Sequence, residues 1–449
     1  MEVRTKKLGA LMIAGAMFLG ACKDDDVATP IDTNTTRISE GGVLTGSYKQ
    51  NVIVEGKNIT LKGYTYFESG TTLTIPAGTT IKSDVTDKGA IIIERGAKIV
   101  AEGTASAPIV FTSGKAVGQR NPGDWGGIII LGKATTNRST EPTIEGGVGR
   151  NYGGTENADN SGILKFVRIE FGGIAAQPGS EINGLTLGAV GSGTVIENIQ
   201  VTYGNDDGFE MFGGTVNMKN LVSFASADDD FDFDFGYTGS IQFAVAIRDP
   251  EFVDAGDAGN GIEADNDGSG SAATPNTRPV LSNFTFVGPG MTTLGNHNYG
   301  NRWRRSVQFV LNNSVMLNWA KGGFSLESDP TATAYSNGTS EFKNNIVHAL
   351  TAPYRSGSTV ITAAQIQSKA EAEGGLTVAN AADVKLTSLD IKNPNLLPAA
   401  GSPALTGAAF GASLPNSFFT ATTYRGAFGT TNWMAGWTNF NFTKGASGY

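Results

Sequence analysis

Residues 46–449 are predicted to form an all-β domain, a right-handed parallel β-helix, from three features of the sequence. Glycine supplies 61 of the 449 residues, and the short apolar runs between Gly, Asn and Asp are typical of strands joined by turns. Ile196–Val201 aligns with Met218–Ser223 at a shift of 22 residues, and the same shift places Phe209 on Phe231. An apolar residue, any residue and then Asn recur, ending at Asn198, Asn220, Asn283, Asn313 and Asn344.

A repeat of this length fits one coil of three short strands, with successive coils stacked about 4.8 Å apart. A jelly roll does not predict the repeat, and propeller blades repeat at about 40 residues or more. The asparagines are interpreted as a structural ladder in a turn, where Asn satisfies backbone groups. They are not interpreted as catalytic residues.

The N-terminus predicts export and lipid anchoring. Residues 1–21 combine basic residues, a short apolar run and small residues, as a secretory signal peptide does. Leu19-Gly20-Ala21-Cys22 resembles the bacterial lipobox, in which Cys22 is lipidated, and the following Lys-Asp-Asp resembles the surface-export signal of Bacteroidetes lipoproteins. Residues 22–45 are predicted to be a flexible tether. The expected location is the outer membrane, facing the cell exterior.

Composition excludes several functional classes. The formal net charge is −9, and an acidic surface disfavours nucleic acid as a partner while suiting cations or neutral glycans. A single cysteine excludes an internal disulfide. His297 and His348 have no acidic or thiol companions at metal-ligand spacing, which argues against a zinc site or a Ser-His-Asp triad.

Insertions and ends are expected around the coils. Residues 133–161 and 249–278 lack the repeat and are predicted to be loops, where functional residues often lie. Residues 361–373 are predicted to form a helix, because Gly374 and Gly375 would stop it. The aromatic C-terminus, with Trp433 and Trp437, is predicted to cap the last coil.

The acidic residues around the repeat predict a calcium site. In residues 230–235 Asp alternates with Phe, so that Phe231, Phe233 and Phe235 are expected to face the core and Asp230, Asp232 and Asp234 to face outward. Stacked carboxylates about 5 Å apart repel by roughly 3 kcal/mol per pair at an effective dielectric constant near 20. Calcium accepts several carboxylate oxygens in flexible geometry. The predicted ligands are Asp206, Asp207, Glu210, Asp228, Asp229, Asp230 and Asp232. A solvated acidic face, or pairing with arginine, remains the alternative.

Three basic or acidic segments lie near these stacked carboxylates, called the acidic row, in the predicted register. A shift of 23 residues places Arg248 over Ala225, where it pairs with a neighbouring aspartate or binds a substrate carboxylate. Residues 263–268 resemble half of a calcium-binding EF-hand loop, or form an acidic surface loop. Arg302, Trp303, Arg304 and Arg305 combine stacking with carboxylate pairing and are predicted either to bind acidic sugars or to form salt bridges with the acidic row.

Several segments carry a family resemblance. Ala107–Ser113, Gly123–Ile128, Asn205–Glu210 and Gly401–Ala404 resemble β-helix lipoproteins of the Bacteroidetes and the wider pectate-lyase-like superfamily. That resemblance implies a calcium-dependent lyase chemistry, with a Lys or Arg base beside the acidic ligands. Arg248 and Lys219 are the candidate bases, although no complete lyase motif is present.

Two functions follow from this sequence. The first is a lipid-anchored surface module that binds a glycan or an outer-membrane protein, with calcium stabilising the acidic row. The alternative is a calcium-dependent polysaccharide lyase acting on polyuronates. Fold alone does not decide between them.

Overall fold

The computed structural model describes residues 34–138, 141–177 and 180–449. The predicted signal peptide, Cys22 and most of the predicted tether lie outside the described residues. Residues 1–34 and 35–449 are separate units, and the second unit carries all the strands and helices described here. No helix in the described part of the chain is long and apolar enough to span a membrane.

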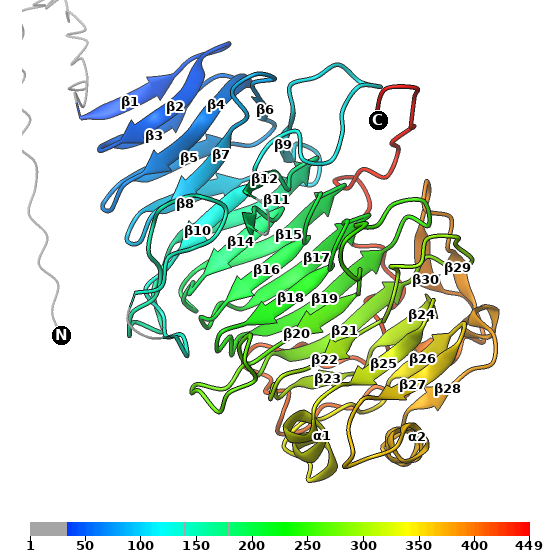
Figure 1. Ribbon diagram of the computed structural model, residues 1–449. Helices are drawn as coiled ribbons and strands as arrows, with labels where there is room; N and C mark the ends of the chain where they lie inside the picture. The colour runs from blue at the N-terminus through cyan, green and yellow to red at the C-terminus, as the bar shows by residue number, and fades with distance from the viewer. Residues whose placement is uncertain (1–33, 139–140, 178–179) are drawn as a thin grey trace, which may run out of the picture. The chain divides into compact units, whose positions relative to one another are not determined.

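Residues 35–449 form a parallel β-helix, in which 26 strands pair into one continuous sheet (Figure 1). Each coil contributes to three stacks of parallel strands. The first stack, called the site sheet, follows from the end of β4 (Asn58–Phe67) and consists of β7 (Ala90–Ile93), β10 (Ile128–Leu131), β14 (Leu185–Gly188), β16 (Phe209–Phe212), β18 (Phe231–Asp234), β20 (Ile262–Ala264), β22 (Arg302–Trp303), β25 (Gly322–Leu326) and β27 (Ala352–Ser356).

The second and third stacks merge in the middle of the solenoid. The second begins with β1 (Thr35–Ile38), β3 (Asn51–Val54), β5 (Thr72–Pro76) and β8 (Lys98–Glu102), and ends with β23 (Val310–Asn312). The third contains β2 (Val43–Tyr48), β6 (Thr80–Ser83), β9 (Ile109–Ser113), β24 (Val315–Trp319), β26 (Ile346–Ala349) and β28 (Leu376–Thr377). Both stacks share the long strands β11 (Gly162–Glu170), β15 (Val195–Thr202), β17 (Met218–Phe224), β19 (Ser240–Ile247) and β21 (Val280–Val287).

The predicted register is confirmed. Ile196 pairs with Met218 and Glu210 with Asp232, both at a shift of 22 residues, and Met218 pairs with Ile241 at a shift of 23. Identical apolar positions therefore stack inside the coil, as the rings of Phe209 and Phe231 do at 5.1 Å.

The asparagine ladder marks the corner between the second and third stacks. The five predicted residues all have a left-handed backbone, with φ between 56° and 61°. Asn tolerates this conformation better than most residues with a side chain. The ladder is structural, as predicted.

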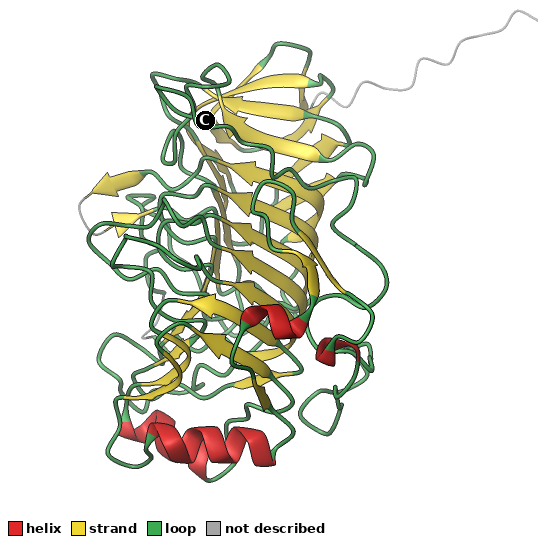
Figure 2. Ribbon diagram, turned by 90° about the vertical axis from the view of Figure 1, so that its right-hand side faces the viewer, coloured by secondary structure: helices red, strands yellow, loops and turns green. Residues whose placement is uncertain are grey.

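Short elements close the end of the solenoid that lies opposite β1. Helix α2 (Ala363–Ala372) begins after the capping residue Thr362 and corresponds to the predicted helix. Helix α1 (Asp329–Ser336) was not predicted. Tyr335 of α1 and Ile366 of α2 join the main core, and both helices lie beyond the last coils in Figures 1 and 2. The remaining short elements are the hairpins β12 (Ala175–Gln177) with β13 (Ser180–Glu181) and β29 (Leu386–Ser388) with β30 (Asn395–Pro398), and the 3-10 turns Ala381–Val384 and Pro403–Leu405.

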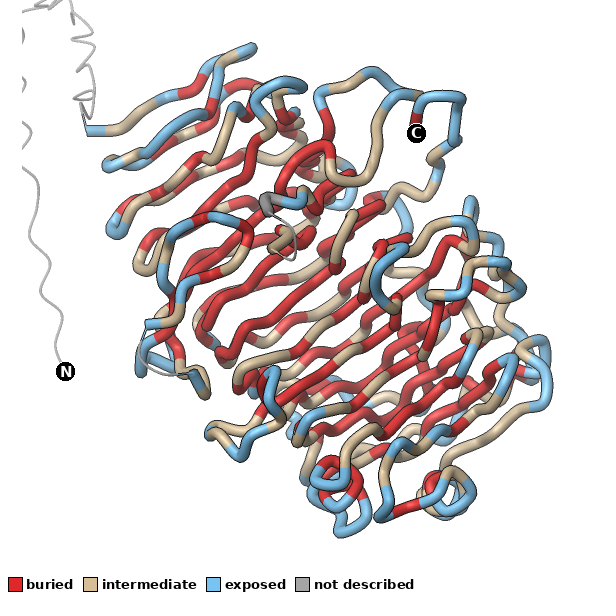
Figure 3. Tube along the Cα trace, viewed as in Figure 1, coloured by how far each residue is buried: buried red, intermediate tan, exposed pale blue. Residues whose placement is uncertain are grey.

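Two boundaries differ from the sequence prediction. Strand β1 and the first half of β2 lie in the segment predicted as a tether, and they pair with β3 and β4, so the β-helix begins at Thr35. The loop predicted at 249–278 contains β20, which belongs to the site sheet. The buried strands and exposed connections are visible in Figure 3.

The C-terminal segment, residues 406–449, does not cap the last coil as predicted. It runs back along the solenoid over the corner of the second and third stacks, toward the N-terminal coils (Figure 1). Asn313 binds Ala409, Gln242 binds Thr420, and Gln200 binds Asn439; the last residue, Tyr449, binds the backbone of Arg120. The prediction was wrong because the side-chain amides of Asn313, Gln242 and Gln200 bind the backbone of this segment along the length of the solenoid.

Candidate metal centre

The acidic residues gather on the site sheet in one line, called the acidic row. The register places Glu210 of β16 beside Asp232 of β18, and Asp232 beside Glu263 of β20. The next strand contributes Arg302 at the same position. Glu210, Asp232 and Glu263 each lie between two core residues of their strands, so their side chains leave the opposite face.

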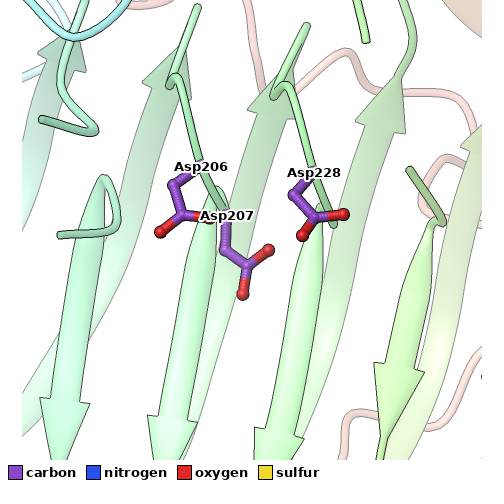
Figure 4. A group of neighbouring side chains, drawn as sticks. All are labelled: Asp206, Asp207 and Asp228. Atoms are coloured by element: carbon purple, nitrogen blue, oxygen red, sulfur yellow. The ribbon is translucent and has the colours of Figure 1, made fainter. Parts of the chain in front are cut away.

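The turns that enter β16 and β18 add three carboxylates to this row. Asp206 and Asp207 precede β16, and Asp228 precedes β18, so the three side chains lie together at the start of neighbouring strands (Figure 4). One oxygen from each of the three lies within 4.8 Å of the others. Asp207, Glu210 and Asp232 form a second group under the same limit. Asp207 is therefore shared by two sets of potential metal ligands.

These carboxylates are less exposed than the sequence predicted. Asp207 is 5% exposed and Glu210 is 8% exposed, whereas Asp206, Asp228 and Asp232 are partly buried. Burial reduces the water available to a charged carboxylate and raises its pKa. Neighbouring carboxylates of the same charge raise it further.

The pKa shifts follow that physical pattern. Burial, followed by the charge of Asp206, raises the pKa of Asp207 well above its ordinary value. Burial and the carboxylate of Glu263 do the same to Asp232. Burial raises the pKa of Asp228 to about 8, and that of Asp234 likewise to about 8. At neutral pH the acidic row therefore either keeps protons or requires cations.

Two loops bring further groups that the sequence analysis missed. Asn183, 1% exposed, precedes β14 and donates its amide hydrogens to Glu210 and to Glu145 of the 133–161 loop. Within the described residues, Asn183 Oδ1 and Asp228 Oδ1 are buried oxygens without a hydrogen-bond partner. Both atoms are hard oxygen ligands of the kind that calcium accepts. No repeat in the sequence signals Glu145, because its loop has no register with the coils.

Two predicted ligands point elsewhere. Asp229 Oδ1 accepts the backbone N–H of Asn260 at 2.6 Å, which ties it to the following coil. Asp230 does not face outward as predicted: it is fully buried, accepts the Ser223 hydroxyl at 2.6 Å and lies 3.4 Å from Arg248. It lies at the corner before β18, where the alternation of the strand has not begun.

The two candidate bases lie away from the open side of the row. Arg248 directly follows Ile247, which pairs with Phe224 at the predicted shift of 23, but its side chain is fully buried and donates to the backbone carbonyls of Ala227 and Asp228. Lys219 is on β17, outside the site sheet, and its Nζ lies 4.8 Å from the ring centroid of Phe418. Neither position supports proton abstraction from a sugar bound at the acidic row.

The basic segment closes salt bridges, which was one of its two predicted roles. Arg302 lies 2.9 Å from both Glu263 and Glu327, while Arg304 and Arg305 lie 2.6 Å and 2.5 Å from Asp265. Trp303 is not a sugar platform, because it is fully buried and stacks on Phe309 at 4.1 Å inside the coil. Successive side chains of a strand point to opposite faces, so Trp303 points inward when the arginines on either side of it point outward.

The acids of the segment that resembled an EF-hand loop are bound by other protein groups. Asp267 Oδ1 accepts hydrogen bonds from the backbone and hydroxyl of Ser269, at 2.9 Å and 2.7 Å. Asp265 is held by the arginines of the neighbouring strand. These contacts form a local turn at the edge of the acidic row.

Comparison with known proteins supports the fold. Residues 46–438 match a protein family described as a pectate-lyase-like β-helix domain. Among solved structures, the crystal structure of pectate lyase Pel9A is similar over 88% of this chain and 97% of that chain, with 14% sequence identity and a TM-score of 0.41. A search of curated proteins finds no match.

Proposed function

Because this chain belongs to the pectate-lyase-like β-helix domain family, a fold consistent with a carbohydrate-related role, we propose that it is a lipid-anchored surface protein that binds an acidic glycan through divalent cations. The cations, calcium foremost, are held by the first part of the acidic row. The observation that carries this proposal is a set of buried and partly buried carboxylates that have no ion-pair partner among the described residues.

The charge distribution along the site sheet supports cation binding. Glu263 pairs with Arg302 of the next strand, and Asp265 pairs with Arg304, which follows that strand. Within the described chain, no Lys or Arg forms an ion pair with the five carboxylates of the two metal groups, Asp206, Asp207, Glu210, Asp228 and Asp232. Unpaired charges are costly when they lose water, so bound cations would remove both the desolvation cost and the mutual repulsion.

The ligand chemistry favours calcium over magnesium or zinc. Calcium accepts six to eight oxygen ligands in flexible geometry, whereas magnesium requires a near-ideal octahedron and zinc usually takes nitrogen or sulfur ligands. The two groups of three carboxylates share Asp207, which is consistent with a pair of neighbouring ions. Asn183 borders the second group through its Nδ2, which donates to Glu210.

A cation bound here would keep positions open for a ligand from solution. Asp206 and Asp228 are only partly buried, so the ions they hold would face solvent on one side. A sugar carboxylate is a hard, negatively charged oxygen ligand and completes the coordination of calcium.

Binding is favoured over lyase activity because both candidate bases are held elsewhere. The test measures binding of hexagalacturonate by calorimetry, in calcium and in EDTA, together with the ultraviolet absorbance of unsaturated products. We expect calcium-dependent binding without product formation. Equal binding in EDTA would contradict the role of the cations, and new absorbance would establish the lyase alternative.

The lipid anchor and surface location rest on the lipobox-like sequence around Cys22. Incorporation of a labelled fatty acid into the wild-type protein, and its loss in Cys22→Ala, would test the anchor. Digestion of the protein on intact cells by added protease would test its outward orientation. A protein protected until the outer membrane is opened would contradict the surface location.

A further inference from the structure

We propose that a second sugar subsite lies at the asparagine-ladder corner, where a pocket of about 320 Å³ takes an uncharged pyranose ring of a glycan. This inference extends the proposed carbohydrate-binding function, but it uses none of the residues of the acidic row. The pocket is lined by Asn220, Phe243, Tyr424, Gly429, Thr430, Thr431 and Trp433.

The pocket forms where the C-terminal segment passes over β17 and β19. Asn220 and Phe243 occupy equivalent positions, because Lys219 pairs with Gln242 and Leu221 with Ala244 on either side of them. The C-terminal segment supplies Tyr424 and the residues up to Trp433. The solenoid thus provides one wall and the segment provides the other.

Phe243 adopts the left-handed backbone conformation that the asparagines of the ladder adopt in other coils. Its φ is 62°, beside 58° for Asn220 in the preceding coil. A bulky aromatic residue in the left-handed region is strained, and such strain is found at functional sites more often than elsewhere. Phe166 occupies the same corner in β11 with φ 49°, but its ring packs edge-on against Trp437 at 5.8 Å. The ring of Phe243 instead borders the pocket.

The polar group of the pocket is an amide that the C-terminal segment does not use. Asn283 donates to the carbonyls of Tyr424 and Gly426, and Asn313 donates to Ala409. In the described part of the chain, the side chain of Asn220 makes no hydrogen bond to the protein. It therefore keeps two donors and one acceptor for a ligand.

The aromatic and uncharged residues that line the pocket favour a neutral sugar over a charged one. The rings of Phe243 and Tyr424 stack at 6.5 Å, and Trp433 stacks on Phe428 at 5.3 Å. Rigid aromatic faces pack against the apolar C–H face of a pyranose, while the amide and threonine hydroxyls bind its hydroxyl groups. The pocket-lining residues carry no charge, so a uronate or phosphate would lose water without gaining a partner.

The experiment titrates the protein with cellohexaose, xylohexaose and mannohexaose, and follows tryptophan fluorescence in calcium and in EDTA. Trp433 lies in the pocket, so we expect a saturable change with at least one of these sugars under both conditions. Phe243→Asn should weaken that binding at least tenfold without lowering the melting temperature, since Asn suits the left-handed backbone.

Phe166→Asn is the matched control, because it makes the same substitution at the same corner of another coil. It should leave the affinity for the neutral sugar unchanged, even though the loss of the Trp437 contact lowers the melting temperature. The proposal is overturned if none of the three sugars binds, or if Phe243→Asn binds as tightly as the wild type. Failure of calcium-dependent hexagalacturonate binding affects only the acidic row, so the two proposals fail separately.

Discussion

Asp207→Asn separates the cation hypothesis from a purely structural acidic row. Asp207 is the residue shared by both groups of potential metal ligands. The substitution keeps the size of the side chain and an oxygen that accepts the backbone N–H of Asp229, now bonded at 2.8 Å. It removes one negative charge from the centre of the row. Its effect should therefore change sign with the presence of calcium.

The structure sets the size of the effect without calcium. The oxygens of each group lie within 4.8 Å of one another, and a pair of charges at that distance repels by about 3.5 kcal/mol at an effective dielectric constant of 20. Partial protonation and salt reduce this repulsion. We expect Asp207→Asn to stabilise the calcium-free protein by roughly 1–3 kcal/mol, a rise of a few degrees in melting temperature.

With calcium present, the same substitution should weaken calcium binding and reduce the stability that calcium adds. The loss of a carboxylate that both ions share should weaken calcium binding at least tenfold, which is about 1.4 kcal/mol. The melting temperature gained on adding calcium should shrink accordingly, because only the ions bound to the folded state stabilise it. Calorimetric titration of the chelator-treated protein measures the affinity directly.

The control is Asp87→Asn, which removes an aspartate with a 57% exposed side chain that pairs with Lys62 at 3.3 Å. It should change the melting temperature little in either condition. Thermal melts of wild type and both variants, in EDTA and in calcium, give the comparison. A lower melting temperature for Asp207→Asn in EDTA, or an undiminished gain from calcium, would refute the reasoning.

Three further results are expected. In EDTA, the raised pKa values of Asp228 and Asp234 mean that the folded protein holds more protons than the unfolded chain. Its stability should therefore fall as pH rises from about 4, the pKa of an unfolded aspartate, to about 8, the pKa of these two residues in the folded protein. Thermal melts across this range should show a flatter profile in calcium. Arg304→Met should lower the free energy of unfolding by about 3–5 kcal/mol, because it leaves a buried carboxylate without its positive partner. The control Arg355→Met removes an exposed arginine of the site sheet and should lower it by under about 0.5 kcal/mol. Denaturant titrations measure both values. Gln242→Leu should cost about 1–3 kcal/mol and speed cleavage of residues 406–449 in limited proteolysis, because the backbone of Thr420 loses both of its bonds to that amide; an unchanged cleavage rate would contradict this.

The features that repeat along the chain could be predicted from the sequence. The pairing of Glu210 with Asp232 and the left-handed asparagines follow from one register, which the sequence displays directly. The helix near residue 363 follows from local signals at its ends. In each case the information lies within about one coil of sequence.

Features that depend on contacts between distant segments could not be predicted. The carboxyl of Glu145 approaches the row only because its loop folds over the site sheet, where Tyr152 contacts Phe212. The C-terminal segment binds Gln200 across 239 residues of sequence. Nothing in the local pattern shows that Trp303 faces inward, because a strand of two residues has no measurable alternation.

The acidic row also shows why a solenoid makes cations a natural solution. Register forces equivalent positions of successive coils to meet, which favours like residues when they are apolar, as with Phe209 and Phe231, and penalises them when they are charged. Further along the site sheet the chain resolves the conflict itself, because Arg302 follows Glu263 in the same line. Glu210 and Asp232, by contrast, are directly paired on neighbouring strands, with no basic residue to separate them. At neutral pH, a fold that maintains this register at Glu210 and Asp232 must either leave their carboxyls protonated or bind cations from solution. Calcium titrations distinguish the two states by the protons that are released.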